Sequence, residues 1–124
     1  MTVGNTGATP IAVTTVTLTP SNTSVNSLLS NAAASGRVYK VVSLLAANVD
    51  GSVAIDTTAS VYSAAALGGT AYPIASTISV PADASLIILD SSTPVVLAAD
   101  RSIGVTSGTA SKIVYTITYE TYLG

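Results

Sequence analysis

The 124-residue sequence contains no cysteine and no histidine. The first absence excludes disulfides and thiolate metal sites. The second excludes Ser-His-Asp and Cys-His nucleophilic arrangements together with the usual zinc sites. The phosphate-binding loops GxxxxGKS/T and GxGxxG are also missing. We therefore expect no enzymatic activity, no catalytic residues, no bound metal and no cofactor.

Charged side chains are scarce as well. They make up 8% of the chain, against about 25% in an ordinary soluble domain. The four basic residues, Arg37, Lys40, Arg101 and Lys112, are scattered, so we expect no nucleic-acid surface. Two explanations of the low charge stay open: partner chains cover much of the surface in the working state, or a Thr/Ser-rich β surface is simply well hydrated.

Long hydrophobic runs are missing despite a mean hydropathy of +0.62. Apolar segments such as 41–47 and 113–117 are much shorter than the roughly 20 residues that a membrane-spanning helix needs. The amino-terminal residues lack the basic stretch and apolar core of a secretory signal. We therefore expect neither a membrane segment nor a signal peptide, and the length fits a single domain.

The sequence does contain a series of short β-rich segments. Residues 11–19 are rich in Val and Thr and end at Pro20, which favours an edge strand. Residues 38–48 are nearly continuously apolar, as in a central strand covered on both faces, and Asp50-Gly51 is a hairpin-turn signal. Further strands are predicted at 53–61, 71–80, 86–89, 95–98 and 103–106. The pattern predicts an all-β, single-domain antiparallel β-sandwich, jelly-roll-like in topology.

The last segment, 111–122, gives the clearest strand pattern. Ile113, Tyr115, Ile117 and Tyr119 alternate with mostly polar residues, so they should share the inward face. Because side chains alternate with a period of two, a one-residue slip would expose all four. We therefore expect a firmly set register and a core role for Tyr115 and Tyr119.

Two segments depart from the strand pattern. Residues 1–10 hold Gly4, Gly7 and Pro10 among small polar residues, which predicts a flexible, extended amino-terminal arm before a sandwich domain at 11–124. Residues 27–34 (SLLSNAAA) carry leucines and alanines, which predicts one short helical turn.

The carboxylates and the remaining tyrosines offer only weak site signals. Asp56-Thr57-Thr58 and Asp90-Ser91-Ser92 faintly resemble the paired loops of aspartic proteases, but both lack the glycine, and turn or solvent-face roles explain them. No spacing selects a carboxylate pair for a glycosidase, and no acidic cluster favours calcium. For the other four tyrosines, core and contact roles stay open: Tyr39, Tyr62, Tyr72 and Tyr122.

Several turn-and-strand segments resemble a family of small tailed-bacteriophage virion proteins. These segments are VYKV at 38–41, AANVDG at 46–51, ISVPA at 78–82, LIILD at 86–90 and the closing VYTITYE at 114–120. The resemblance covers roughly residues 25–122. It implies a β domain that decorates a capsid or is otherwise attached to a virion, and that is not an enzyme.

The resemblance and the composition together predict a phage head decoration (cement) protein. It would bind and stabilise the major capsid protein lattice as a homo-oligomer, with a trimer as one form, on the surface of a virion assembled in the host cytoplasm. Residues 1–12 and the 11–19 strand would anchor it by adding a strand to a neighbouring edge.

Two alternatives remain at this stage. The first is a tail, neck or fibre component of the same virion. The second is a glycan-binding adhesion module with a site formed by Tyr62, Tyr72 and Asp56, since such sites combine aromatic and carboxylate groups.

Overall fold

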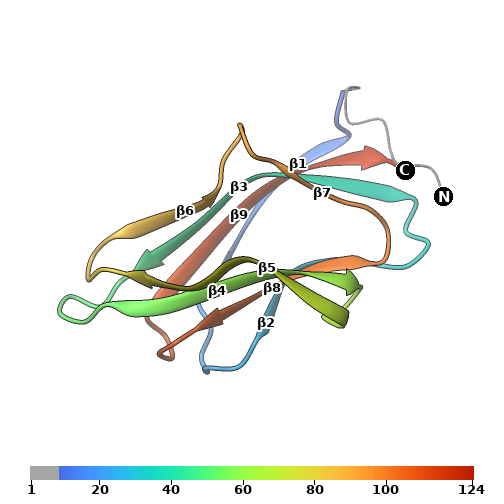
Figure 1. Ribbon diagram of the computed structural model, residues 1–124. Coiled ribbons are helices and arrows are strands. Elements are labelled where there is room, and N and C mark those ends of the chain that lie inside the picture. The colour runs from blue at the N-terminus through green and yellow to red at the C-terminus, as the bar shows by residue number, and fades with distance from the viewer. Residues whose placement is uncertain (1–8) are drawn as a thin grey trace.

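The computed structural model describes residues 9–124, which form two antiparallel β-sheets packed face to face (Figure 1). Sheet A has five strands, in the order β1-β9-β3-β6, with β7 also paired to β3. Sheet B has four strands, in the order β2-β8-β4-β5. The strands are β1 Ala12–Leu18, β2 Asn26–Asn31, β3 Arg37–Asn48, β4 Ile55–Ala64, β5 Gly68–Val80, β6 Ser85–Leu89, β7 Val95–Leu97, β8 Arg101–Ser107 and β9 Ile113–Leu123.

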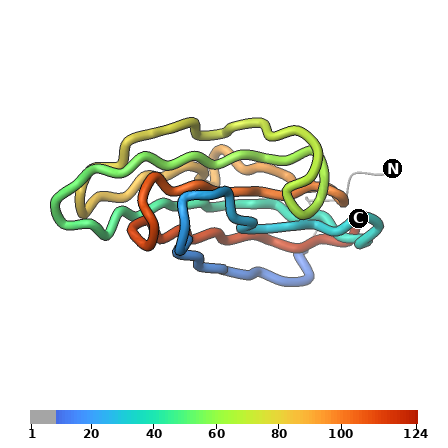
Figure 2. The backbone as a smooth tube through the Cα atoms, turned by 90° about the horizontal axis from the view of Figure 1, so that it is seen from below, coloured from blue at the N-terminus to red at the C-terminus, as the bar shows by residue number. Residues whose placement is uncertain are grey.

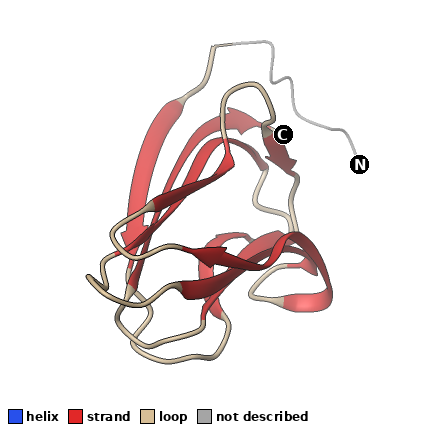
Figure 3. Cartoon of the chain, turned by 60° about the vertical axis from the view of Figure 1, so that its left-hand side comes forward, coloured by secondary structure: helices blue, strands red, loops and turns tan. Residues whose placement is uncertain are grey.

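The order of the strands is that of a jelly roll. The chain passes from one sheet to the other at most connections, so that β1, β3 and β9 lie in sheet A while β2, β4 and β8 lie in sheet B. Figure 3 shows the two sheets as separate layers, built from strands and loops in the part of the chain that the structure describes. The predicted all-β antiparallel sandwich is therefore confirmed, and so is its jelly-roll topology.

The connections gather at the two ends of the sandwich (Figure 2). At one end the loop 49–54 meets the turn 81–84, where Asp83 N donates to Asp50 O at 3.1 Å. At the other end Ala65 N donates to Asp100 Oδ1 at 3.0 Å. Because the loops are held at the ends by such bonds, the outer faces of the sheets between them stay free.

The core lies between the inner faces of the two sheets. On β9, Ile113, Tyr115 and Ile117 alternate inward and are fully buried, and β8 supplies Ile103 from the opposite sheet. Burial of one aliphatic side chain of this size stabilises a fold by about 1.5–3 kcal/mol. The inward face predicted for the last strand is confirmed, and Tyr119 packs partly buried against the same core.

The helical turn predicted at 27–34 is wrong, because β2 occupies this part of the chain. Leu28 and Leu29 are both buried, and the register with β8 shifts between Ser27 and Leu29. A helix this short is unstable in water without packing. Pairing with β8 gives the backbone its ladder hydrogen bonds and still buries both leucines.

The prediction that the 38–48 strand is covered on both faces is also wrong. In β3, Val41, Leu44 and Ala46 are fully buried on the inner face, whereas Ser43 and Leu45 on the outer face are only partly buried. Apart from Lys40, the outer-face residues of β3 are small or aliphatic, and a register shift with β9 falls between Val41 and Ser43. Both features hide the alternation that normally marks a strand buried on one side.

The Asp50-Gly51 hairpin prediction is wrong, since β3 and β4 lie in different sheets. The Asp50 carboxylate instead orders the crossing loop, accepting from Ser52 N at 2.9 Å and Val53 N at 3.1 Å. The other predicted strands correspond to β4 to β8, with ends displaced by a few residues.

The hairpin between β4 and β5 turns at Ala66 and Leu67, one residue before the expected glycine break. Both residues have positive φ, 54° and 61°, a conformation that is unfavourable for any residue with a Cβ atom. Their N–H groups donate to Ser30 Oγ and Ser102 Oγ, each at 2.9 Å. Leu67 lies over Gly104, where a Cβ would come within 2.7 Å of its Cδ2. Tertiary contacts therefore fix this turn.

The predicted edge strand 11–19 is confirmed as β1, which among the described strands pairs with β9 alone. Pairing begins at Ile11, whose N–H donates to Thr121 O at 2.8 Å. Most of the expected arm, residues 1–8, lies outside the described residues.

Two buried asparagines fasten the ends of the sandwich. Asn48 Nδ2 donates to Val53 O at 2.9 Å and to Val80 O at 3.0 Å, while its Oδ1 accepts from Asp50 N at 2.8 Å. Asn31 has the same role at the other end, where its amide donates to two backbone carbonyls. Each side chain satisfies backbone groups that strand pairing does not reach.

We predict that Asn48→Ala lowers the free energy of unfolding by about 2–4 kcal/mol, because it leaves several inward-facing backbone groups without partners. Denaturant unfolding followed by circular dichroism would measure the loss. The matched control is Asn22→Ala, which removes an exposed amide and should cost less than about 1 kcal/mol. Equal effects of the two substitutions would contradict this role for Asn48.

Candidate interaction surface

The outer face of sheet A is covered by hydroxyl and aliphatic side chains. Cross-strand register aligns them in two neighbouring rows: Thr15, Thr118 and Ser43, then Thr17, Thr116, Leu45 and Ile87. Val13 and Val96 lie in a third row on the same side. We use "outer face of sheet A" for the surface formed by these nine residues and by Lys40 and Glu120, which complete the third row.

Three aliphatic side chains on this face are well exposed. Val13 and Ile87 are each 63% exposed and Val96 is 43% exposed. Single exposed aliphatic residues are common on soluble proteins. Three on one sheet face, separated mainly by threonine, make this face a candidate contact surface.

The outer face of sheet A carries little charge. Lys40 and Glu120 stand opposite each other on β3 and β9, and the other nine residues of the face are uncharged. Among residues 9–124 the one ion pair within 4.0 Å joins Lys112 Nζ to Asp50 Oδ2, at 3.9 Å, in the end loops. Covering the outer face would therefore require the desolvation of only two ionic groups, which are of opposite sign.

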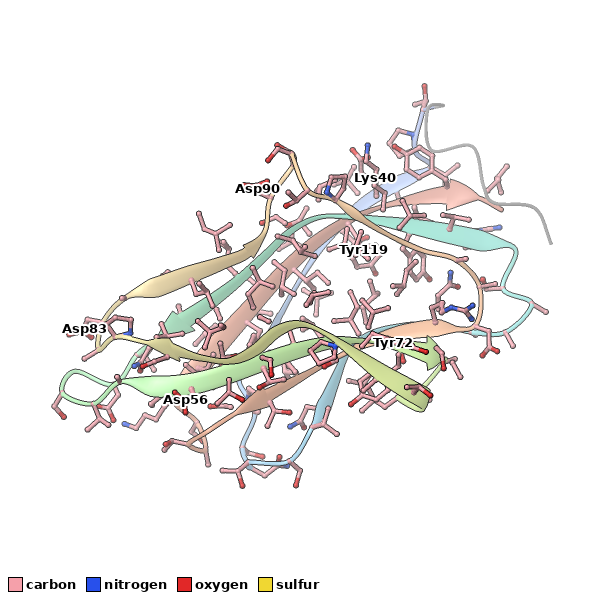
Figure 4. All side chains as sticks on the ribbon, in the orientation of Figure 1. Lys40, Asp56, Tyr72, Asp83, Asp90 and Tyr119 are labelled. Carbon is pink, nitrogen blue, oxygen red and sulfur yellow. The ribbon has the colours of Figure 1, made fainter. Side chains whose placement is uncertain are left out.

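The two aspartates with faint protease-like surroundings are not brought together. Asp56 lies on β4 in sheet B, whereas Asp90 follows β6 in sheet A, and Figure 4 shows them well separated. Asp90 Oδ1 accepts from Ser92 Oγ at 2.6 Å and from Ser92 N at 2.9 Å. These bonds hold the pKa of Asp90 below its ordinary value. Asp90 is therefore a turn-forming residue.

The three residues considered for a glycan site do not converge either. Asp56 and Tyr62 are six positions apart on β4, a separation of about 20 Å along an extended strand. Tyr72 pairs with Val61, the neighbour of Tyr62, and so points to the opposite side of sheet B from Tyr62. No shared binding site is formed by this trio.

The tyrosines divide between core and surface. Tyr115 is fully buried, and the rings of Tyr39 and Tyr119 pack with centroids 4.9 Å apart. Tyr72 is 60% exposed on the edge strand β5. The predicted core role of Tyr115 and Tyr119 is confirmed, and Tyr72 is the tyrosine best placed for a contact.

The Tyr115 hydroxyl is held between the two sheets. It donates to Thr106 O at 2.9 Å and shares a hydrogen bond with the Thr57 hydroxyl. Burial raises the pKa of Tyr115, and the bond with Thr57 partly opposes the rise. The hydroxyl therefore links the two sheets inside the core.

Residues 9–124 offer neither a metal-binding cluster nor a membrane-spanning helix. No group of three or more His, Cys, Asp or Glu side chains lies close enough to hold a metal ion. No helix in this part of the chain is long and apolar enough to cross a membrane.

Comparison with known proteins gives an informative likeness to a solved structure. No family model matches the chain, and no curated protein matches it. The similar structure is described as "Bacillus endospore appendages form a novel family of disulfide-linked pili"; the TM-score is 0.53, with 14% identity over 90% of this chain and 85% of that one. At such low identity the likeness shows a shared fold alone. The disulfide links of those pili have no counterpart here, because this chain lacks cysteine.

We predict that the stability of the protein falls as the pH rises above about 10. The unfolded chain loses the Tyr115 proton near that pH, whereas the folded chain, whose pKa is raised, still holds it. One such group contributes a slope of up to about 1.4 kcal/mol per pH unit. Urea unfolding across the alkaline range would measure the slope.

Tyr115→Phe should make this slope shallower, although it also lowers stability at neutral pH by removing the bond to Thr106 O. Tyr72→Phe, which removes an exposed hydroxyl, serves as the control and should keep the wild-type slope. An unchanged slope in Tyr115→Phe would show that another group causes the alkaline loss.

Proposed function

We propose that this protein is a non-enzymatic structural subunit that works while attached to other protein subunits. The observation that carries the proposal is the outer face of sheet A, where exposed Val13, Ile87 and Val96 lie among threonines with a single pair of opposite charges. A surface of this kind associates at little electrostatic cost. The jelly roll supplies a rigid scaffold for it.

The assembly that we propose is a phage head. The chain would act there as a decoration (cement) protein that binds and stabilises the major capsid protein lattice, on virions assembled in the host cytoplasm. The sequence resemblance supports this choice. Two of the resembling segments, 38–41 and 114–120, are neighbours in sheet A because β3 pairs with β9, so the resemblance falls on the sheet that bears the candidate surface.

A filament subunit is the second candidate. The observation that favours it is the fold shared with the endospore appendage protein. A filament of this chain would have to be held by non-covalent contacts alone, because no cysteine is present. A tail, neck or fibre position in a virion belongs to the same structural class.

We predict that the protein is present in high copy number on purified phage heads, in a fixed ratio to the major capsid protein. A cement protein occupies every equivalent site on a symmetric lattice. Quantitative mass spectrometry of heads separated from tails would measure the ratio. A few copies per particle would place the protein in the tail or neck, and regular filaments of the protein alone would favour the second candidate.

We also predict that Ile87→Asp weakens attachment to capsids lacking the protein by about ten-fold or more, because a covered aspartate must be desolvated. Co-sedimentation over a concentration series would measure the affinity. Val53→Asp is the control, since Val53 is 55% exposed in the loop 49–54, away from the outer face of sheet A. Equal binding of the two variants would exclude this face as the attachment surface.

A further inference from the structure

Free strand edges are the second kind of surface that this fold offers for association. An edge strand presents unpaired N–H and C=O groups at alternate residues, and these pair readily with another strand. Soluble proteins usually block such edges with proline, lysine, bulges or very short strands.

Most free edges of the described chain carry at least one of these devices. Edge strand β5 contains Pro73, shows several register shifts against β4, and has a left-handed residue at Thr77 (φ 50°). Edge strand β2 has a register shift after Ser27. Strands β6 and β7 are only 5 and 3 residues long.

Strand β1 carries none of them. Its sequence, AVTTVTL, contains no proline and no charged residue. All seven residues pair with β9 in one unbroken register, from Ala12↔Thr121 to Leu18↔Tyr115. Five consecutive β-branched residues, 13–17, favour the extended conformation. In Figure 3, β1 is the strand that follows the grey amino-terminal trace and borders one layer.

The sequence of β1 is also complementary to itself. An antiparallel pair centred on Thr15 places Val13 opposite Thr17 and Thr14 opposite Val16 of the second copy, each twice. Cross-strand pairs of β-branched residues are favourable, and no like charges meet. Val13, which is 63% exposed in the single chain, gains a neighbour on the outer face of sheet A.

We infer that β1 is the self-association site, where two copies join antiparallel about Thr15 and fuse their five-stranded sheets into one. The inference rests on the proposed structural role and names one of its partners, a second copy of this chain. The pair is isologous, so the same strand supplies both halves of the contact. The two outer faces of sheet A then lie side by side on one continuous surface.

The test uses charge at the centre of the pair. Thr15 is exposed, and its side chain points to the outer face, so Thr15→Lys and Thr15→Glu should fold. Each variant alone places two like charges directly opposite each other and should weaken self-association about ten-fold or more. An equal mixture of the two should form heterodimers at wild-type concentrations. Sedimentation velocity on the full chain would measure all three samples.

Thr70→Lys, at the free edge of β5, is the control and should associate as the wild type does. Circular dichroism would check the fold of each variant. In a second measurement, Thr15→Cys introduces the only cysteine of the chain and should give a covalent dimer on mild oxidation, because directly opposite residues bring their Cβ atoms within reach of a disulfide. Thr70→Cys should remain a monomer under the same oxidant.

The outcomes separate this inference from the proposed function. Association that is weakened in each Thr15 variant and restored in their mixture supports the β1 pair. A wild-type oligomer that neither Thr15 charge affects overturns the β1 pair and leaves the structural role standing. A monomeric wild type that still coats capsids in high copy number also overturns the β1 pair and leaves the structural role standing. A chain that neither associates nor binds any particle overturns both.

Discussion

The structure depends on the burial of the apolar inner faces of the two sheets against each other. Ile113, Tyr115 and Ile117 of β9 meet inner-face residues such as Ile103 of β8, and this apolar contact is the main interaction between the two sheets. Ion pairs contribute almost nothing, since the described residues form one, and it is long and lies in the end loops. Because the inner faces supply the cohesion, the core places little constraint on the composition of the outer faces.

Polar groups act at the ends of the sandwich, where strand pairing stops. Asn31 and Asn48 occupy the two ends, and the Tyr115 hydroxyl bridges the sheets through Thr57 and Thr106. No buried side-chain polar atom in the described chain lacks a partner. Such full satisfaction fixes the crossings between the sheets without using charge, which is how a chain with 8% charged residues still specifies one topology.

The low content of charged residues also shapes the outer surface of the protein. On the outer face of sheet A, the threonine hydroxyls can hydrogen-bond to water, while covering the exposed aliphatic groups would be favourable. At the border of that sheet, the free edge of β1 contains no proline and no charged residue that would hinder pairing with another strand. The face and the edge adjoin along β1, whose side chains Val13, Thr15 and Thr17 belong to the outer face while its unpaired backbone groups form the edge. A similar fold occurs in an endospore appendage protein, whose disulfide links could not form in this chain because it lacks cysteine.

The sequence by itself determined the fold class and the inward row of the last strand, because alternation with a period of two is local information. It also indicated the edge position of β1, through the Val- and Thr-rich segment that ends at Pro20. It did not determine β2, where a bulge hides two buried leucines in a helix-like pattern, or the one-sided burial of β3. Nor could it place the outer face of sheet A, since that surface combines residues from five strands far apart in the chain. Tertiary structure decided these features because they depend on which strands become neighbours, and that choice is made by packing between the sheets.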